Sequence, residues 1–516
     1  MALHNDLRPA LPLLPLLPGV VIPVLAGKVA LDLHGGGLDL LAGFFGAALH
    51  PSWDLTLIEA LWRGLQITVF TAMLSWSGSC LFGCVLGFLS SEKICTLLIS
   101  SAAPSRWLRR VLAPLRSLHE LIWGLLLLQL CGLNAWVAVA AIALPYTSLM
   151  ARVVADQIDS HDTPTLMALQ CMGAGSLANL LTALWPAVST SLGHHMDHRL
   201  ECALRSALLL GVFGLGGLGT DLKLSLQSLQ FRELWSGLWL LAIVMAMLEL
   251  LVHRSRSKLV LPAMGLAPLI AIPWGRSLDL DLAIPTILLP ANPLFTGTVR
   301  ESLASALASA PWADLMLSTL GLTLLASAIA IAGPPLGLLL LPGRLSNITQ
   351  RFVWGGLRLL PPPLTALLLL LLAKPSLSLA ALALGLHHLG MMGRVLQDDL
   401  DCSTDQNHLA VQAMGAGPRI AWLYGKLAMS CRSYLAYSAY RADVILRDTA
   451  VVGMVGGAGL GWQLIESLTS FHWAMVFWLV IAYACLTSLG EGLSHWMLER
   501  WACKAGQLQQ GSSRWR

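Results

Sequence analysis

Three charged residues, Arg441, Asp443 and Arg447, stand just before a glycine-rich apolar run. Asp443 and Arg447 are four residues apart, so on a helix they share a face and can form an ion pair. A charge at bilayer depth costs at least about 2.5 kcal/mol, so such residues normally face a bundle interior or a water-filled cavity. Arginines in that setting could bind an anion through charge-assisted hydrogen bonds.

The same charge pattern occurs 242 residues earlier in the chain. HRLECALRSALLLGVFGLGGLG, residues 198–219, aligns without gaps to YRADVILRDTAVVGMVGGAGLG, residues 440–461. The aligned pairs are Arg199 with Arg441, Glu201 with Asp443, Arg205 with Arg447, Gly211 with Gly453, Gly214 with Gly456, Gly217 with Gly459 and Gly219 with Gly461. MALQCMGAG, residues 167–175, aligns to LAVQAMGAG, residues 409–417, in the same register. One register kept over about a hundred residues indicates an internal repeat.

The repeat lies in a strongly apolar chain. Of its 516 residues, 56% are hydrophobic and only 12% are charged, and apolar runs recur along nearly the whole length. The runs are continuously apolar rather than alternating, which favours membrane-spanning helices over a barrel. We therefore predict an all-α polytopic membrane protein with two homologous halves of about six helices each, 1–256 and 257–516. The predicted helices are 11–31, 62–89, 119–132, 134–155, 187–214, 235–252, 259–275, 313–341, 359–374, 377–394, 430–456 and 472–494.

Basic residues indicate how these helices are oriented. They cluster in four stretches, at 93–116, 254–258, 344–358 and 500–516. The positive-inside rule places all four stretches in the cytoplasm, and with them both termini. Both halves then have the same orientation, which makes them a parallel repeat with its axis along the membrane normal. A substrate path would lie between the halves, with a ring of four arginines and two acids around that axis.

Two interpretations of the charged residues stay open. Each acid–arginine pair could instead fix its helix to a neighbour near the membrane surface, with the arginine side chain reaching toward water. Arg199 and Arg441 have no acid at that spacing, which favours a place in the substrate path. The glycines permit close helix packing or a broken helix. They do not indicate a nucleotide site, because no strand–turn–helix context surrounds them.

In each half, the polar loop after the fourth helix contains a short helix-like segment that ends in Gly-Ala-Gly. The two segments read DTPTLMALQCMGAG and STDQNHLAVQAMGAG. A start at Asp, Ser or Thr and a stop at Gly are typical of a capped surface helix. On the cytoplasmic face such a helix could dock into a partner, or it could be an ordinary connector.

The two segments and their neighbours resemble the coupling loop of ABC importer permeases. The matching positions are Ala168, Gly173 and Pro186 in the first half, and Ala410 and Gly415 in the second. Ala428 stands where the second half would have its proline, and Met167 and Leu409 stand where that family has a glutamate.

Longer blocks narrow the resemblance. LRSLHELIWGLLLLQLCGL (115–133), YRADVILRDTAVVGMVGGAGLG and WQLIESL (462–468) are similar to the phosphonate importer permease, over about 42–252 and, more weakly, about 313–495. The resemblance implies the type I (MetI-like) ABC importer fold, with two permease halves fused in one chain. It implies a non-catalytic permease subunit that moves a small anionic phosphorus compound across the bacterial inner membrane by alternating access.

The same resemblance implies partners. Two ATPase subunits would bind the cytoplasmic face and a solute-binding protein the external face, while the chain itself lies in the lipid bilayer and binds no nucleic acid. No Walker sequence occurs in the chain, so ATP and Mg²⁺ would be held by the ATPase partners and no cofactor by this chain. The histidine clusters at 194–198 and 387–388 lack a carboxylate or thiolate set with metal-site spacing, so no metal site is expected.

Two alternative functions stay open. Fused permeases for ferric iron, thiamine or another oxyanion share the architecture, although arginines in the path disfavour a cationic cargo. A secondary transporter with two parallel halves would need an ion gradient and no ATPase. The repeated Gly-Ala-Gly loops disfavour this second alternative.

Overall fold

The described chain is built of long apolar helices. The computed structural model describes residues 11–512 apart from 161–167, 170, 174, 255–259, 284, 286–298, 342–343, 403–405 and 457–458. Helix α3 (Leu55–Ser90), for example, begins after Asp54, whose carboxylate accepts a hydrogen bond from the amide of Thr56. The described chain forms two compact units, a first unit of residues 44–292 and a second unit of residues 1–43 with 293–516.

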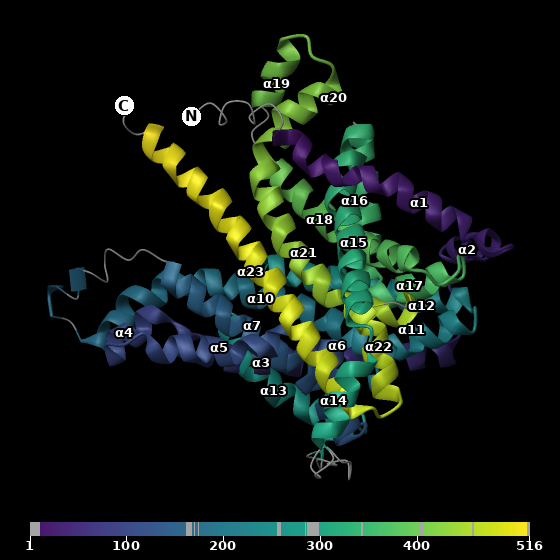
Figure 1. Ribbon diagram of the computed structural model, residues 1–516, viewed down its shortest axis with the longest axis horizontal. Coiled ribbons are helices and arrows are strands. Elements are labelled where there is room, and N and C mark those ends of the chain that lie inside the picture. Colours follow the sequence, from purple (N-terminus) through teal and green to yellow (C-terminus); the bar gives the residue numbers. More distant parts are fainter. Residues whose placement is uncertain are drawn as a thin grey trace. The chain divides into compact units, whose positions relative to one another are not determined.

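The first unit is built around α3. This helix packs against α7 (Ala135–Ser160), α10 (Trp185–Leu210) and α13 (Val260–Ser277), drawn in blue and teal in Figure 1. Phe70, Leu74, Val139 and Ala271 form one buried apolar cluster between α3, α7 and α13. The remaining elements of the unit are α4 (Glu92–Ile99), α5 (Ala103–Ser117), α6 (Glu120–Cys131), α9 (Ser176–Asn179), η3 (Leu180–Leu184), η4 (Gly211–Leu215), α11 (Leu218–Gln227) and α12 (Phe231–Arg254). Helix α2 (Gly37–Ala47) crosses the boundary between the units.

The second unit repeats this plan around α15 (Trp312–Leu340). This helix packs against α18 (Leu377–Cys402), α21 (Ala428–Gly456) and the N-terminal 3₁₀ helix η2 (Leu11–Val20). In Figure 1, α19 (Gln406–Ala413) and α20 (Pro418–Ala421) lie beyond the ends of α18 and α21. The remaining elements are α1 (Val21–Leu31), α14 (Val299–Ser309), α16 (Arg344–Leu359), α17 (Pro362–Leu370), η7 (Trp422–Leu427), α22 (Gly459–Thr469) and α23 (Trp473–Ser512).

The first helix of each sequence half packs in the unit formed by the other half. In the first unit, Ser77 of α3 donates a hydrogen bond to the carbonyl of Met264 in α13, at 2.6 Å. In the second unit, Gly19 of η2 lies so close to Leu336 of α15 that a Cβ atom there would be 2.6 Å from it. The compact units therefore differ from the predicted halves 1–256 and 257–516, which stay a prediction about the sequence repeat.

All twelve predicted helices fall on helical segments, but fewer are long and apolar enough to be spans. Seven helices qualify among the described residues, or up to ten if each of three sharply bent pairs counts as one span. The predicted helices 119–132, 187–214 and 359–374 each overlap one of these bent pairs. Helices α13 and α21 form as predicted but are not among these spans. The protein is thus an all-α multi-pass membrane protein.

The repeat register is visible in the ion pairs. Arg109 pairs with Asp159 in the first unit, and Arg351 pairs with Asp401 exactly 242 residues later in the second. The pairs Arg152–Asp156 and Arg394–Asp398 are related by the same offset. Charged side chains at equivalent positions therefore make equivalent contacts within each unit.

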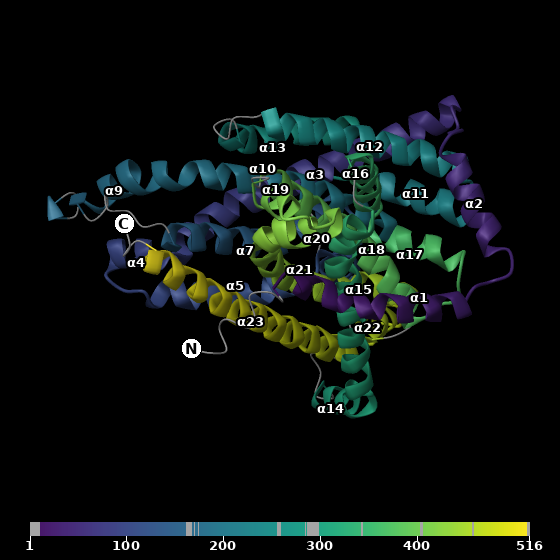
Figure 2. The ribbon, with the colours of Figure 1, turned by 90° about the horizontal axis from the view of Figure 1, so that it is seen from above.

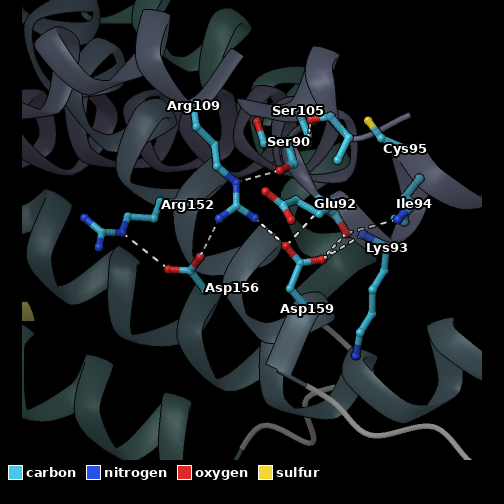
Figure 3. Close-up of polar contacts among 12 residues, drawn as sticks. Ser90, Glu92, Lys93, Ile94, Cys95, Ser105, Arg109, Arg152, Asp156 and Asp159 are labelled. Atoms are coloured by element: carbon cyan, nitrogen blue, oxygen red, sulfur yellow. Dashed lines mark hydrogen bonds and ion pairs between the residues drawn. The ribbon is translucent and has the colours of Figure 1, made fainter. Parts of the chain in front are cut away.

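One element breaks the repeat. Only three residues separate α15 from α16, whereas α4 lies between α3 and α5 in the first unit. Asp159 caps this helix, because it accepts hydrogen bonds from the hydroxyl of Ser91, at 2.6 Å, and from the amides of Glu92 and Lys93, both at 3.1 Å. Figure 3 shows Asp159 beside Glu92 and Lys93. The first unit therefore carries an additional helix on this carboxylate, whereas the equivalent Asp401 pairs with Arg351 and with no other of the described residues.

Candidate functional site

The aligned glycines form a tight turn in each unit. Gly217 precedes α11 with φ +88°, and the amide of Leu218 donates a 2.9 Å hydrogen bond to the hydroxyl of Thr68. Gly459 begins α22 with φ +84°, and the amide of Leu460 donates a 2.9 Å hydrogen bond to the hydroxyl of Thr319. A left-handed backbone at these two positions favours glycine, since a side chain would also meet the threonine.

The other glycines allow the helices on either side of the turn to approach closely. A Cβ atom on Gly211 would lie 3.0 Å from the Cα of Gly219, and one on Gly453 would lie 2.9 Å from the Cα of Gly461. Gly214 has φ +92° and interrupts the helix, and the segments on either side, His195–Leu215 and Leu218–Gln227, are bent by 58°. Gly456 ends α21. This geometry combines both sequence interpretations, because the glycines pack closely and also break a helix.

Each acid of the repeated block pairs with the arginine four residues later. Arg205 pairs with Glu201 in α10. Arg447 lies 2.6 Å from Asp443 in α21 and 3.9 Å from Glu491 in α23. All five side chains are largely buried, so these are interior ion pairs rather than surface ones. They join α21 to α23 in the second unit.

Arg199 has a different environment from the paired arginines. Its guanidinium lies over the ring of Tyr146 in α7, 5.6 Å from the ring centroid. The Tyr146 hydroxyl is 2.8 Å from that of Ser206, which in turn donates a 2.6 Å hydrogen bond to Glu120 of α6. A continuous polar network therefore connects α6, α7 and α10 in the first unit.

The second unit has a changed version of this network. His388 and Asp448 occupy the positions of Tyr146 and Ser206 in the 242-residue register, and Nε2 of His388 lies 3.1 Å from Oδ2 of Asp448. Pro362 occupies the position of Glu120. Sequence comparison of the halves missed both networks, because aligned positions of different residue type give no repeat signal.

In the described part of the chain, no partner is found for the side chain of Arg441. Only 8% of its surface is exposed, and its buried Nε makes no hydrogen bond. No ion pair, ring contact or other hydrogen bond joins its side chain to any of the described residues. Although it is equivalent to Arg199 in the repeat, its buried charge has no counter-charge among the residues that the structure describes.

The candidate coupling loops form matching exposed tips. The carbonyl of Ala168 accepts a hydrogen bond from the amide of Met172, and Gly173 follows with φ +78°. In the second unit, the carbonyl of Ala410 accepts from the amide of Met414, and Gly415 follows with φ +85°. A left-handed glycine directly after the last turn ends each short helix.

The residues at these tips are open to solvent or to a partner. Met172 is 79% and Met414 is 85% exposed. Pro186 lies in the first turn of α10 and is also exposed. Figure 2 shows α9 beyond the start of α10, and Figure 1 shows α19 beyond the start of α21. Each tip is therefore close in sequence to the helix that carries the repeated charges.

A π-helix connects each tip to its charged helix. The two π-helices are η3 (Leu180–Leu184) and η7 (Trp422–Leu427), which begin exactly 242 residues apart. Each contains wider turns than an α-helix, a feature that is rare and often occurs at functional sites. The sequence offered no signal for these turns, since they depend on backbone hydrogen bonding and not on a residue pattern.

Known proteins resemble the chain as follows. The phosphate-import permease PhnE of Mycolicibacterium smegmatis is 25% identical over 425 residues, which cover 76% of this chain and 77% of the relative. The putative cryptic phosphonate transport system permease PhnE2 of Escherichia coli is 30% identical over 113 residues, which cover 22% of this chain and 93% of the relative. The phosphite transport system permease PtxC of Stutzerimonas stutzeri is 27% identical over 221 residues, which cover 42% of this chain and 74% of the relative.

The lengths of these alignments fit the repeat. The alignment with PhnE, 425 residues, is longer than either predicted half, whereas the 221 residues shared with PtxC amount to less than one half of this chain. No family model and no solved structure matches the chain. The three relatives are nevertheless all named as permeases for phosphate, phosphite or phosphonate. PhnE2 is matched over nearly its entire length. The chain therefore belongs to the permease family of phosphonate-type ABC importers.

Proposed function

We propose that this chain is the fused transmembrane subunit of an importer that moves a small phosphorus oxyanion across the bacterial inner membrane. The observation that carries the proposal is its relationship to permeases named for phosphate, phosphite and phosphonate. These three cargoes share a tetrahedral phosphorus centre with anionic oxygens. Arginines at one repeated position, the half-buried Arg199 and the buried Arg441, supply complementary charge.

The partners follow from the exposed tips. Two ATPase subunits would bind the helices that end at Gly173 and Gly415, where an exposed methionine precedes each glycine. Because each tip occurs once in each unit, the chain offers two equivalent docking sites, one for each ATPase subunit. ATP and Mg²⁺ would be bound by those subunits, and no cofactor by this chain. A solute-binding protein would deliver the oxyanion at the opposite face of the membrane.

The connection from each exposed tip to its arginine-bearing helix suggests how the movement driven by ATP hydrolysis is transmitted. A displacement of either tip passes through a π-helix, η3 or η7, into α10 or α21. A π-turn stores an extra residue and can convert to an α-turn, which rotates the helix that follows it. Closure of the ATPase subunits would thereby reorient the arginine-bearing helices and shift the population between inward-open and outward-open states.

The test is to co-express the chain with its genomic neighbours, purify the complex and reconstitute it in proteoliposomes. ATP hydrolysis is then measured with the binding protein and phosphate, phosphite or methylphosphonate. Ferric iron and thiamine serve as cationic comparisons. We expect stimulation only by phosphorus oxyanions. A purified complex that contains no ATPase, or stimulation by a cationic cargo alone, would contradict the proposal.

A separate measurement tests the orientation. Both termini are expected in the cytoplasm, since basic residues follow the apolar part of the last helix, Trp473–Ser494, and an even number of spans returns the chain to the same side. Reporter proteins that are active only in the cytoplasm should therefore be active when they are fused to either end. Activity at one end alone would indicate an odd number of spans.

A further inference from the structure

The charged residues of α21 lie on two different faces of the helix. Each residue of an α-helix advances about 100° around the axis, so Asp443 and Arg447 are about 200° and 240° from Arg441. The Asp443–Arg447 pair accordingly lies on the face that meets α23, where Glu491 is 3.9 Å from Arg447. Arg441 is on the other face. The paired and unpaired charges of the block therefore cannot act on one ligand as a single cluster.

The face of Arg441 also carries Ser438, Ile445 and Asp448, which are close to it in angle around the helix. The Ser438 hydroxyl donates to the carbonyl of Tyr434, at 2.7 Å, within α21. Asp448 lies 3.1 Å from His388 of α18. Ile445 is fully buried and apolar. Ser438 and Asp448 are thus engaged with other residues, and neither is paired with Arg441.

A guanidinium that is only 8% exposed and has no carboxylate or hydrogen-bond acceptor among the described residues is unfavourable, because it has lost most of its contact with water. Arg447, six residues later on the same helix, shows the usual arrangement, with two carboxylates within 4 Å. A group that arrives with the transported ligand can satisfy the charge of Arg441. Two oxygens of a phosphorus oxyanion match the planar fork of an arginine.

The equivalent position in the first unit does not offer the same site. The positive charge of Arg199 is already placed over the ring of Tyr146. Position 388 holds a histidine in place of this tyrosine, and no ring contact is made by Arg441. Arg441 is therefore the arginine of the four on which this inference rests, and the ring of four arginines and two acids stays a prediction.

We propose that Arg441 is the anion-binding residue of the transport path and that it binds two oxygens of a phosphorus oxyanion. This inference rests on the proposed function and specifies the residue through which it acts. Arg205 and Arg447 are then structural residues that hold their helices through ion pairs. Their removal should affect folding, whereas removal of Arg441 should affect transport.

The experiment uses the complete complex in proteoliposomes, with saturating binding protein and phosphite as the probe. Arg441→Met removes the guanidinium and keeps an apolar stem, and Arg447→Met is the matched control on the same helix. We measure phosphite uptake, ATP hydrolysis stimulated by the loaded binding protein, and the thermal midpoint of the complex. Arg441→Lys tests whether the planar fork matters in addition to the charge.

For Arg441→Met we expect phosphite uptake to fall at least tenfold while stimulated ATP hydrolysis changes less than twofold. The thermal midpoint should be unchanged or raised, because an uncompensated buried charge has been removed. Arg447→Met should lower the midpoint, because it leaves Asp443 and Glu491 without their cation. Arg441→Lys should retain part of the uptake, since a point charge remains but the two-oxygen contact is lost.

Three results would overturn the inference. The first is phosphite uptake by Arg441→Met within twofold of the wild type. The second is a parallel loss of uptake and ATP hydrolysis in Arg441→Met. The third is a lowered thermal midpoint in Arg441→Met that Arg441→Lys restores together with full uptake. The last two would show that Arg441 acts through coupling or folding. Failure of the proposed function itself looks different, because the wild-type complex would then show no uptake of phosphite, phosphate or methylphosphonate.

Discussion

The glycine turn in the second unit offers a direct test of the packing argument. Gly459 has φ +84°, and a Cβ atom there would lie 2.8 Å from the hydroxyl oxygen of Thr319. That oxygen accepts the amide hydrogen of Leu460 at 2.9 Å. The substitution Gly459→Ala therefore strains the backbone and displaces the acceptor of a buried amide.

The magnitude follows from these two effects. A left-handed backbone costs an ordinary residue about 1–2 kcal/mol, and a buried amide that loses its acceptor costs a further 1–3 kcal/mol, roughly. We expect Gly459→Ala to lower the free energy of unfolding by about 2–5 kcal/mol, the sum of these terms. The assay is denaturant unfolding of the purified protein in detergent, followed by tryptophan fluorescence. Gly321→Ala in α15 is the control, because a Cβ atom there meets nothing within 4 Å.

A double-mutant cycle separates strain from the hydrogen bond. Thr319→Ala removes the acceptor and makes room for the new Cβ atom, so the double variant Gly459→Ala, Thr319→Ala should be less destabilised than the sum of its single changes. The backbone strain at φ +84° would remain in the single variant Gly459→Ala and in the double variant. The reasoning is refuted if Gly459→Ala is as stable as Gly321→Ala, or if the two single effects simply add.

Three further predictions concern ion pairs, tips and the additional helix. Asp443→Asn should lower stability by about 3 kcal/mol in a thermal melt, because it breaks a buried pair, whereas Asp398→Asn, whose side chain is 57% exposed, should cost under about 1 kcal/mol. Met414→Glu should reduce co-purification of the ATPase without lowering the thermal midpoint of this chain, and retained co-purification would contradict docking at the tip. Asp159→Ala should accelerate amide hydrogen exchange in α4 by removing its cap, and Asp401→Ala, which caps no such helix, should leave the same amides unchanged.

The sequence predicted the interactions that depend on spacing within one helix. A separation of four residues was enough to predict the Glu201–Arg205 and Asp443–Arg447 pairs, and both form. The register of the repeat does not say which unit a helix packs in, so the placement of α13 beside α3 was not predicted. Hydropathy also cannot locate the bends of 84° and 96° before α6 and α17, because these depend on the backbone between two helices.

The networks on α7 and α18 show how the halves have diverged while keeping one kind of contact. In the first unit, a carboxylate on α6, Glu120, reaches Tyr146 through the hydroxyl of Ser206. In the second unit, the carboxylate belongs to α21, and Asp448 meets His388 directly.

Each unit thus joins its α7-type helix to its arginine-bearing helix with one acid, but the acid has moved from one helix to another. The move changes what lies beside the arginine. A tyrosine ring covers the charge of Arg199, whereas no aromatic ring of the described residues covers the buried charge of Arg441. A fused chain permits this difference, because its halves always meet in the same pair. A homodimer of one half would place identical residues on both sides and would have to choose between a covered and an available arginine.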